Sequence, residues 1–258
     1  MPTEEKSSAL TCLEVWGGNR EVTRSMELPG LAVWLYSQPL AGSVGGDVYY
    51  LSLCSQGNLT RVGMADVSGH GKAVSRLGAR LRELMQEHIN TFDQSELARE
   101  LNRDFGQEAA DRRFATVALL GICRGTGELV LTNGGHPWPL WYRARAKMWT
   151  MLMEGIPETQ AASTDLPLGV IPGTGYRQMA TRLDPGDLVI VYSDAFSDSC
   201  DQAGQMLGPQ GVLQLARDFP VDSPEAAGQA LLKSVELYRG GRPTHDDQTV
   251  VALQRLAA

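Results

Sequence analysis

Short runs of alternating or continuously apolar residues predict β-strands along much of the chain. Two early runs, LAVWLYSQPL and DVYYLSLCS, are rich in aromatic and branched side chains. Gln-Gly-Asn at 56–58 predicts a hairpin turn before the returning run LTRVGMADV. A second hairpin is predicted at Gly-Thr-Gly, residues 125–127. The run LVIVY at 188–192 is apolar at every position, which is typical of a strand that is buried on both faces.

Other segments have the helical period, in which apolar side chains recur on one face. They are residues 74–89, 95–109, 208–219 and 223–239. The second of these has Asp93 or Ser95 as its expected N-cap. The last begins with Ser223 as the expected cap and Pro224 at the first helical position.

The order of these elements predicts the class of fold. Helices lie between groups of strands and not between every pair, and hairpins imply antiparallel pairing. The layout therefore predicts an α+β fold in which helices cover packed sheets. We expect residues 1–28 to form an N-terminal extension, either a loose segment or an edge strand, and residues 29–258 to form one domain.

Composition narrows the class of protein. The chain has 258 residues, of which 43% are hydrophobic and 21% charged, as in soluble globular proteins. Its net charge of −7 argues against an extended nucleic-acid surface. No apolar run is long enough for a membrane span, and the polar, acidic N-terminus is unlike a signal peptide. We therefore expect a cytoplasmic protein with no nucleic-acid or membrane partner.

Acidic residues stand at the ends of apolar strand-like runs in four places. They are Asp47 in SVGGDVYY, Asp66 in MADVSGHG, Asp194 in VYSDAFSD, and the pair Asp246 and Asp247 in THDDQTVV. A fold that brings these strand ends together gathers carboxylates that repel and raise each other's pKa. A divalent cation compensates such repulsion, and all-oxygen ligands select Mg²⁺ or Mn²⁺ over zinc. The pattern therefore predicts a metal site.

Each of these residues also has a simpler structural explanation. Asp66 before Gly-His-Gly can be a turn residue or a helix cap, and the glycines at 45–46 can form a bulge. Asp194 can cap the segment that follows it, and residues 246–247 can be an ordinary acidic turn. Taken singly, the structural explanations are preferred. The occurrence of all four together favours metal binding.

Two histidines lie near these acids or in a similar turn. His70 follows Asp66 closely and can either shuttle protons or hold the loop. His136, between Gly and Pro, is expected to bond a nearby backbone group. Competing motifs are absent, since the chain has neither a phosphate-binding P-loop sequence nor a Gly-x-Ser-x-Gly elbow.

Five motifs together resemble a known family. VGGDVYY, ADVSGHG, LTNGGHPWPLWY, LVIVYSDAFSD and HDDQTVVAL occur in the order of the motifs of the metal-dependent protein phosphatases, the PPM or type 2C superfamily. They look most like the bacterial sporulation stage II protein E type, and the resemblance runs from about Leu31 to Leu256. It implies a four-layer α-β-β-α sandwich of two mainly antiparallel sheets flanked by helices.

The resemblance also implies an activity and its residues. The activity is hydrolysis of protein phosphoserine or phosphothreonine by a hydroxide bridged between two Mn²⁺ or Mg²⁺ ions. Asp66 would bridge the ions, and Asp66 and His70 are the expected catalytic residues. Asp247 stands where the family often has Asn, and Asp198 would help to hold a third, weaker ion. The implied metal ligands are the side chains of Asp47, Asp66, Asp194, Asp246 and Asp247 and the backbone carbonyl of Val67.

The resemblance further implies a substrate protein. Bacterial relatives act on phosphorylated anti-sigma factor antagonists in partner-switching pathways, and this chain is expected to do the same. Control by a partner, by homodimerisation or by the predicted helices after residue 70 is left open.

Two departures from the family pattern support an alternative. Tyr50 replaces an acid of the first motif, and Ala195 replaces a glycine after Asp194. Alanine does not tolerate positive φ, so a site that needs that angle would displace Asp194. The alternatives to a protein phosphatase are a catalytically weak binding or scaffold member of the fold, and a metal hydrolase of small phosphate esters.

Overall fold

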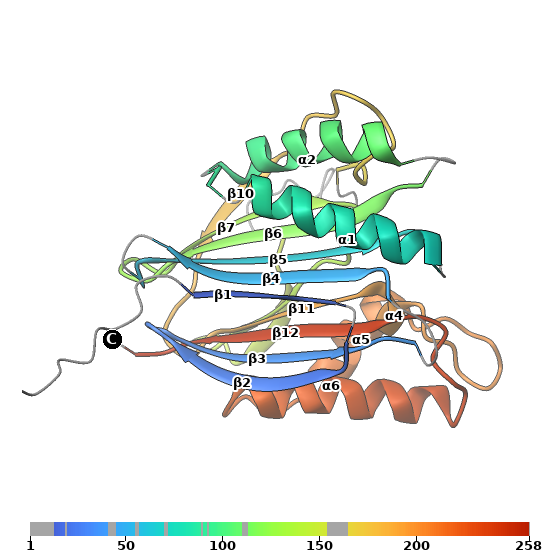
Figure 1. Ribbon diagram of the computed structural model, residues 1–258. Helices are drawn as coiled ribbons and strands as arrows, with labels where there is room; N and C mark the ends of the chain where they lie inside the picture. Colours follow the sequence, from blue (N-terminus) through green and yellow to red (C-terminus); the bar gives the residue numbers. More distant parts are fainter. Residues whose placement is uncertain are drawn as a thin grey trace, which may run out of the picture.

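Two six-stranded sheets form the centre of the molecule (Figure 1). The computed structural model describes residues 13–18, 20–40, 45–54, 57–69, 72–88, 90–91, 93–109, 113–153 and 165–257. The first sheet, called sheet A, has in spatial order β1 (Leu13–Gly17), β4 (Asp47–Cys54), β5 (Leu59–Val67), β6 (Ala115–Cys123), β7 (Glu128–Gly134) and β10 (Gln178–Arg182). Sheet B has β2 (Val22–Leu28), β3 (Leu31–Gln38), β12 (Gln248–Arg255), β11 (Leu188–Tyr192), β8 (Leu140–Arg143) and β9 (Met148–Met151).

Helices cover the outer face of each sheet, which completes four layers (Figure 1). Sheet A is covered by α1 (Lys72–Glu87) and α2 (Gln94–Glu108). Sheet B is covered by α4 (Asp194–Ser197), α5 (Gly208–Ala216) and α6 (Pro224–Arg239). All pairs of neighbouring strands in both sheets are antiparallel. The predicted α+β sandwich is therefore confirmed.

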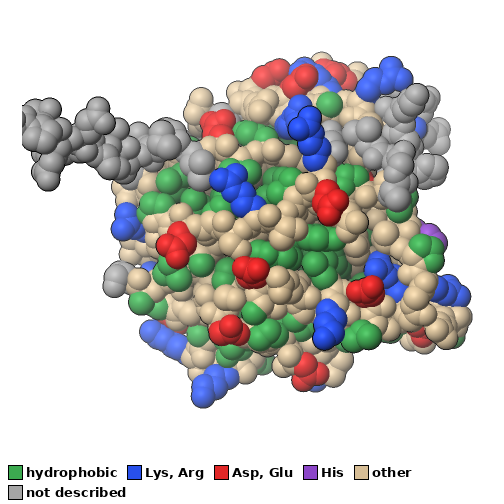
Figure 2. Space-filling model, turned by 60° about the horizontal axis from the view of Figure 1, so that its bottom comes forward, with side chains coloured by type: hydrophobic (Ala, Val, Ile, Leu, Met, Phe, Trp, Pro, Cys, Tyr) green, Lys and Arg blue, Asp and Glu red, His purple; other side chains and the backbone are tan. Residues whose placement is uncertain are grey.

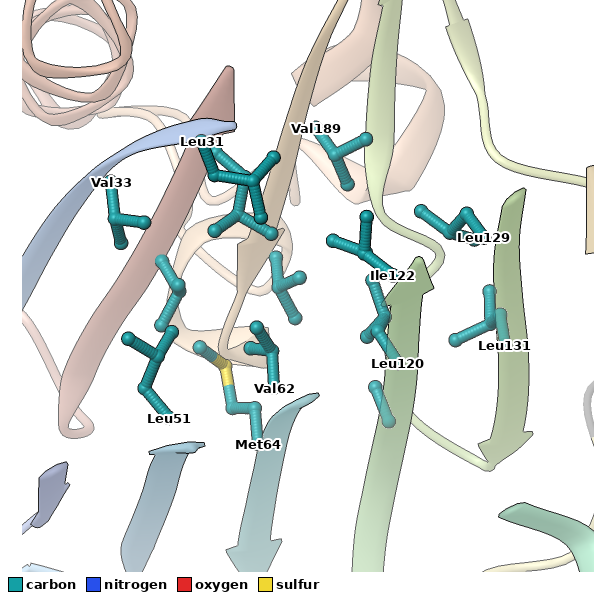
Figure 3. Close-up of a cluster of buried hydrophobic side chains, with 14 of the residues drawn as sticks. Leu31, Val33, Leu51, Val62, Met64, Leu120, Ile122, Leu129, Leu131 and Val189 are labelled. Carbon is teal, nitrogen blue, oxygen red and sulfur yellow. The ribbon is translucent and has the colours of Figure 1, made fainter. Parts of the chain in front are cut away.

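Three apolar layers hold these elements together. Between the sheets, side chains from alternate strand positions interdigitate (Figure 3), among them Leu51, Met64, Leu120 and Val189. A second layer joins sheet A to α1 and α2, and a third joins sheet B to α4, α5 and α6. The run 188–192 is buried at every position because β11 lies between the first and third layers. This confirms the prediction from its continuous apolar pattern.

Helix ends agree with the sequence signals within about two residues, except that α5 ends at Ala216, three residues before the predicted end at 219. The Asp93 side chain caps α2 by accepting the backbone N–H groups of Ser95 and Glu96. Ser223 caps α6 in the same way through Ala226, and Pro224 is the first residue of that helix.

The N-terminal strands β1 and β2 form one edge of each sheet. β1 pairs with β4 and β2 with β3, and Leu28 at the end of β2 is buried between the sheets. The division of the chain at residue 28 stays a prediction, and residues 1–12 lie outside the described part.

Two further observations concern the distribution of surface charge and the hydrophobicity of the helices. Acidic and basic side chains are interspersed over the face shown in Figure 2, so the negative net charge is not gathered into one block there. Within the described ranges, no helix is both long enough and apolar enough to cross a membrane.

Candidate functional site

The acids predicted from the strand ends meet at one end of the sandwich, where α4 lies (Figure 1). Asp47 begins β4 and stands directly opposite Asp66 near the end of β5. Asp194 opens α4 just after β11, and Asp246 precedes β12, which pairs with β11. Both sheets present these strand ends at the same end of the sandwich. Each of the four carboxylates therefore interacts electrostatically with at least two of the others.

Asp47 is the most deeply buried of these acids. The residue is 1% exposed, and its Oδ2 atom has no hydrogen-bond partner among the described residues. Burial and the charge of Asp66 raise the pKa of Asp47 well above its ordinary value, while a hydrogen bond from Thr249 lowers it. A buried carboxylate with an unpaired oxygen and a like charge opposite is unfavourable unless a proton or a cation accompanies it.

The other carboxyl groups show the same electrostatic strain. Burial, followed by the charges of Asp194 and Asp246, raises the pKa of Asp66 to about 8. Burial, followed by the charges of Asp198 and Asp246, raises the pKa of Asp194 to about 6. Positive charge placed among these groups would restore their ionised forms.

Asp247 accepts backbone N–H groups with both of its carboxylate oxygens, while the carboxylate of Asp246 also bonds the backbone, through Oδ1 and the Asp247 N–H at 2.9 Å. Oδ1 of Asp247 accepts the Leu40 N–H at 2.7 Å, and its Oδ2 accepts the Gly46 N–H at 2.6 Å. The side chain thereby ties the turn before β4 to the start of β12. Both oxygens serve this turn, so Asp246 is the better placed of the two acids to bind an ion.

The paired glycines at 45–46 are required by close packing. A Cβ on Gly45 would lie 2.4 Å from Oδ2 of Asp247. A Cβ on Gly46 would lie 3.0 Å from the carbonyl oxygen of Val67 and 3.3 Å from Oδ1 of Asp66. The turn therefore passes directly against two of the predicted ligand groups, which leaves no room for a side chain.

The donor set fits a hard divalent cation, although the carboxylates do not converge on one point. Four carboxylates and a carbonyl offer only oxygen, which suits Mg²⁺ or Mn²⁺. Within the described residues, no three Asp, Glu, His or Cys side chains approach closely enough to hold a metal ion. The groups interact electrostatically over longer distances, as expected where repulsion is uncompensated.

Sequence comparison identifies the family of this chain. The family model described as Stage II sporulation protein E (SpoIIE) matches residues 56–256. The chain belongs to the SpoIIE family. The predicted resemblance to bacterial type 2C phosphatases is confirmed at this level. No curated protein matches the sequence.

Solved structures share the fold of this SpoIIE family member. The RsbU and RsbW domains of Rv1364c from Mycobacterium tuberculosis give a TM-score of 0.71 at 23% identity, covering 89% of this chain and 61% of that one. The SiaA-PP2C domain of Pseudomonas aeruginosa gives 0.71 at 19%, covering 86% and 85%. The PP2C phosphatase domain of SpoIIE from Bacillus subtilis, with a fragment of its regulatory domain, gives 0.71 at 16%, covering 95% and 70%.

The structure shows the surroundings of both departures from the family pattern, Ala195 and Tyr50. Ala195 lies within α4, and among the described residues Lys147 is the only non-glycine with positive φ. The predicted strain at position 195 is therefore absent. Tyr50 is buried in the layer beneath α1, stacks on Trp16 with ring centroids 4.9 Å apart, and fills the space over Gly63. It faces away from the carboxylates.

The predictions for His136 and His70 are tested to different extents by the structure. His136 is buried, its Nδ1 shares a hydrogen bond of 2.9 Å with the Thr116 hydroxyl, and its backbone carbonyl accepts from Asn133. Burial lowers the pKa of His136 to about 3, so the ring is neutral. This agrees with its predicted structural role. His70 lies outside the described residues, and its catalytic role stays a prediction.

A cavity beside the acids is also lined by two arginines that the sequence did not single out. It is lined by Asp194, Asp198 and Asp246 and also by Arg239, Arg242 and His245. The signal available in the sequence was the segment RGGRPTH, which places two arginines and a histidine directly before Asp246.

Proposed function

We propose that this SpoIIE family member is a metal-dependent phosphatase that hydrolyses phosphoserine or phosphothreonine in a protein. The observation that carries the proposal is the buried pair of facing acids, Asp47 and Asp66, in which one carboxylate oxygen of Asp47 has no hydrogen-bond partner in the part of the chain that the structure describes. Raised pKa values at both residues and at Asp194 support a site that is completed by positive charge.

Each group at the site has a distinct role in this proposal. Asp47, Asp66, Asp194, Asp246 and the carbonyl of Val67 would hold two Mn²⁺ or Mg²⁺ ions. Ions bound there would lower the pKa of a water and compensate the charge that develops on a phosphoryl group. Asp247 fixes the turn that carries Asp47 and keeps Gly46 against Val67. Asp66, deeply set between the sheets, is the residue whose ionisation the activity most requires.

The proposed substrate is a small phosphoprotein of the anti-sigma factor antagonist class, in the cytoplasm of a bacterium. The support is the five-motif resemblance together with membership in the SpoIIE family. Similar structures include a chain described as RsbU and RsbW domains and one described as part of the bacterial stressosome.

The test is hydrolysis of p-nitrophenyl phosphate and of a phosphoserine protein by the purified chain. We expect turnover with Mn²⁺ or Mg²⁺, none with EDTA, and a loss of at least about 100-fold in Asp66→Asn. Asp218→Asn is the matched control, because Asp218 is an exposed aspartate after α5. Metal-independent turnover, or full activity in Asp66→Asn, would contradict the proposal.

One observation favours the binding or scaffold alternative. Within the described residues the acids do not converge into a metal-binding geometry, which is also expected of a member that recognises a phosphoprotein without hydrolysing it. The two functions are separated by equilibrium dialysis with Mn²⁺. Stoichiometric binding of two ions supports the phosphatase, and the absence of binding by the folded protein supports the alternative.

A further inference from the structure

A cavity of about 190 Å³ lies between α4 and the segment that follows α6. Its walls carry opposite charges. Its lining residues include three aspartates, Asp194, Asp198 and Asp246, and two arginines, Arg239 and Arg242, which are called the basic wall below. Asp194 and Asp198 come from α4 and the residue after it, whereas the arginines and Asp246 come from the end of α6 and the segment that follows it. These parts of the chain are more than 40 residues apart and meet only in the folded protein.

The basic wall has unused hydrogen-bond donors. Arg239 is the last residue of α6, and its Nε and Nη1 atoms are buried without an acceptor in the described part of the chain. Arg242 is exposed and donates from Nη2 to the carbonyl of Gln202 at 2.9 Å, and its guanidinium makes no other hydrogen bond to the described residues. Buried guanidinium donors without an acceptor are costly, so they point to an anionic ligand.

The segment that carries these arginines is held in place. The Gln202 side chain donates to the carbonyl of Gly240 at 2.8 Å, and the Tyr238 hydroxyl donates to the carbonyl of Gln205 at 3.0 Å. Gly240 adopts a left-handed conformation that ends α6 and turns the chain toward Arg242. The arginines are therefore positioned by the loop at 202–205 before any ligand arrives.

The position of the cavity relative to the acids determines which part of a bound substrate the arginines would contact. Asp47 and Asp66, which are deeply set between the sheets, are not among its lining residues, whereas Asp194, Asp198 and Asp246 are. The cavity thus extends outward from the acids. In the function proposed above, the acids would hold cations that neutralise the charge of the phosphoryl group. The arginines then face the substrate residues next to the phosphorylated one.

We propose that Arg239 and Arg242 bind a carboxylate of the phosphoprotein that lies beside the phosphorylated residue, and so select substrates with acidic flanks. This inference rests on the proposed phosphatase function. The guanidinium fork matches a carboxylate in two hydrogen bonds, which makes arginine better suited to this task than lysine.

The experiment compares two phosphoserine octapeptides that differ only in having Glu or Gln on both sides of the phosphoserine. With Mn²⁺ we expect kcat/KM for the Glu peptide to be about tenfold higher, through a lower KM. Arg242→Gln and Arg239→Gln should each bring the ratio of the two values close to one. Arg242→Glu should reverse it. The matched control is Arg217→Gln, because Arg217 is exposed at the end of α5 and outside the cavity; it should keep the tenfold ratio.

The ratio of the two kcat/KM values also distinguishes a failure of the arginine proposal from a failure of the phosphatase function. Equal kcat/KM values in the parent overturn the proposal, as does a variant that loses activity toward both peptides by the same factor. If the parent hydrolyses neither peptide, the phosphatase function has failed, and the same peptides are then compared by fluorescence anisotropy with Mn²⁺ present. Tighter binding of the Glu peptide that is lost in Arg242→Gln supports the arginine site, and equal binding overturns it. Arg242 is exposed, so its variants should keep the melting temperature of the parent.

Discussion

Removal of one charge from the acidic cluster should stabilise the metal-free protein. In Asp66→Asn the side chain keeps its size but no longer repels Asp194 and Asp246. The folded-state pKa of Asp66 is raised from 3.8 to about 8, so the folded protein disfavours the charged form. The resulting loss of stability is absent below pH 3.8, grows as the pH rises toward 8, and is constant above that.

The magnitude of this loss of stability follows from the difference between the pKa of Asp66 in the unfolded chain, 3.8, and its pKa in the folded protein, about 8. Each pH unit between them is worth about 1.4 kcal/mol, which gives about 6 kcal/mol of lost stability at pH above 8 when the neighbouring acids are charged. Asparagine still buries a polar group, so we expect about half of this to be recovered, about 3 kcal/mol. For a domain of this size the melting temperature should rise by roughly 6–12 °C.

The assay is thermal unfolding followed by circular dichroism in EDTA, at pH 4 and at pH 8. At pH 4 the variant and the parent should differ by less than about 1 kcal/mol, because pH 4 lies just above the unfolded-state pKa of 3.8, where the loss of stability has only begun to grow. Added Mn²⁺ should raise the melting temperature of the parent and have much less effect on Asp66→Asn. A lower melting temperature of the variant at pH 8 in EDTA would refute the reasoning, since the carboxylate would then be stabilising.

Three further predictions concern the turn before β4 and the start of α4. Asp247→Ala leaves the N–H groups of Leu40 and Gly46 without their acceptor, so urea unfolding should show a loss of about 2–4 kcal/mol; no loss would mean that water replaces the carboxylate. Gly46→Ala pushes a methyl group against Val67, and titration calorimetry should show weaker Mn²⁺ binding; unchanged binding would remove the Val67 carbonyl from the site. Ala195→Gly should lower stability by about 1 kcal/mol without raising kcat, because the position is helical; a clear gain in kcat would restore the strain hypothesis.

The secondary structure could be predicted closely because its signals are local. Helix caps such as Asp93 and Ser223 act within three residues, and the periodicity of strands and helices is set by neighbouring side chains. The four-layer arrangement depended instead on the resemblance. Local patterns do not say which strands meet, and the last strand of the described chain pairs between β3 and β11.

The candidate site was predictable only in part. The acids were found because they interrupt apolar runs, and the structure brings them to one end of the sandwich. The bonds of Asp247 were not predictable, since its two partners lie 207 and 201 residues away. The arginine wall was missed for a similar reason, because only the tertiary fold places the end of α6 beside α4.

The central place of β12 in sheet B has a consequence for synthesis on the ribosome. Until residues 248–255 have emerged, β2 and β3 have no hydrogen-bonded connection to β11, β8 and β9. Sheet A can pair completely from segments made earlier, whereas sheet B must wait as two separate fragments with open edges. The facing pair Asp47 and Asp66 therefore forms with sheet A, whereas Asp246 joins these acids only when β12 pairs, so the acidic cluster is completed late in folding.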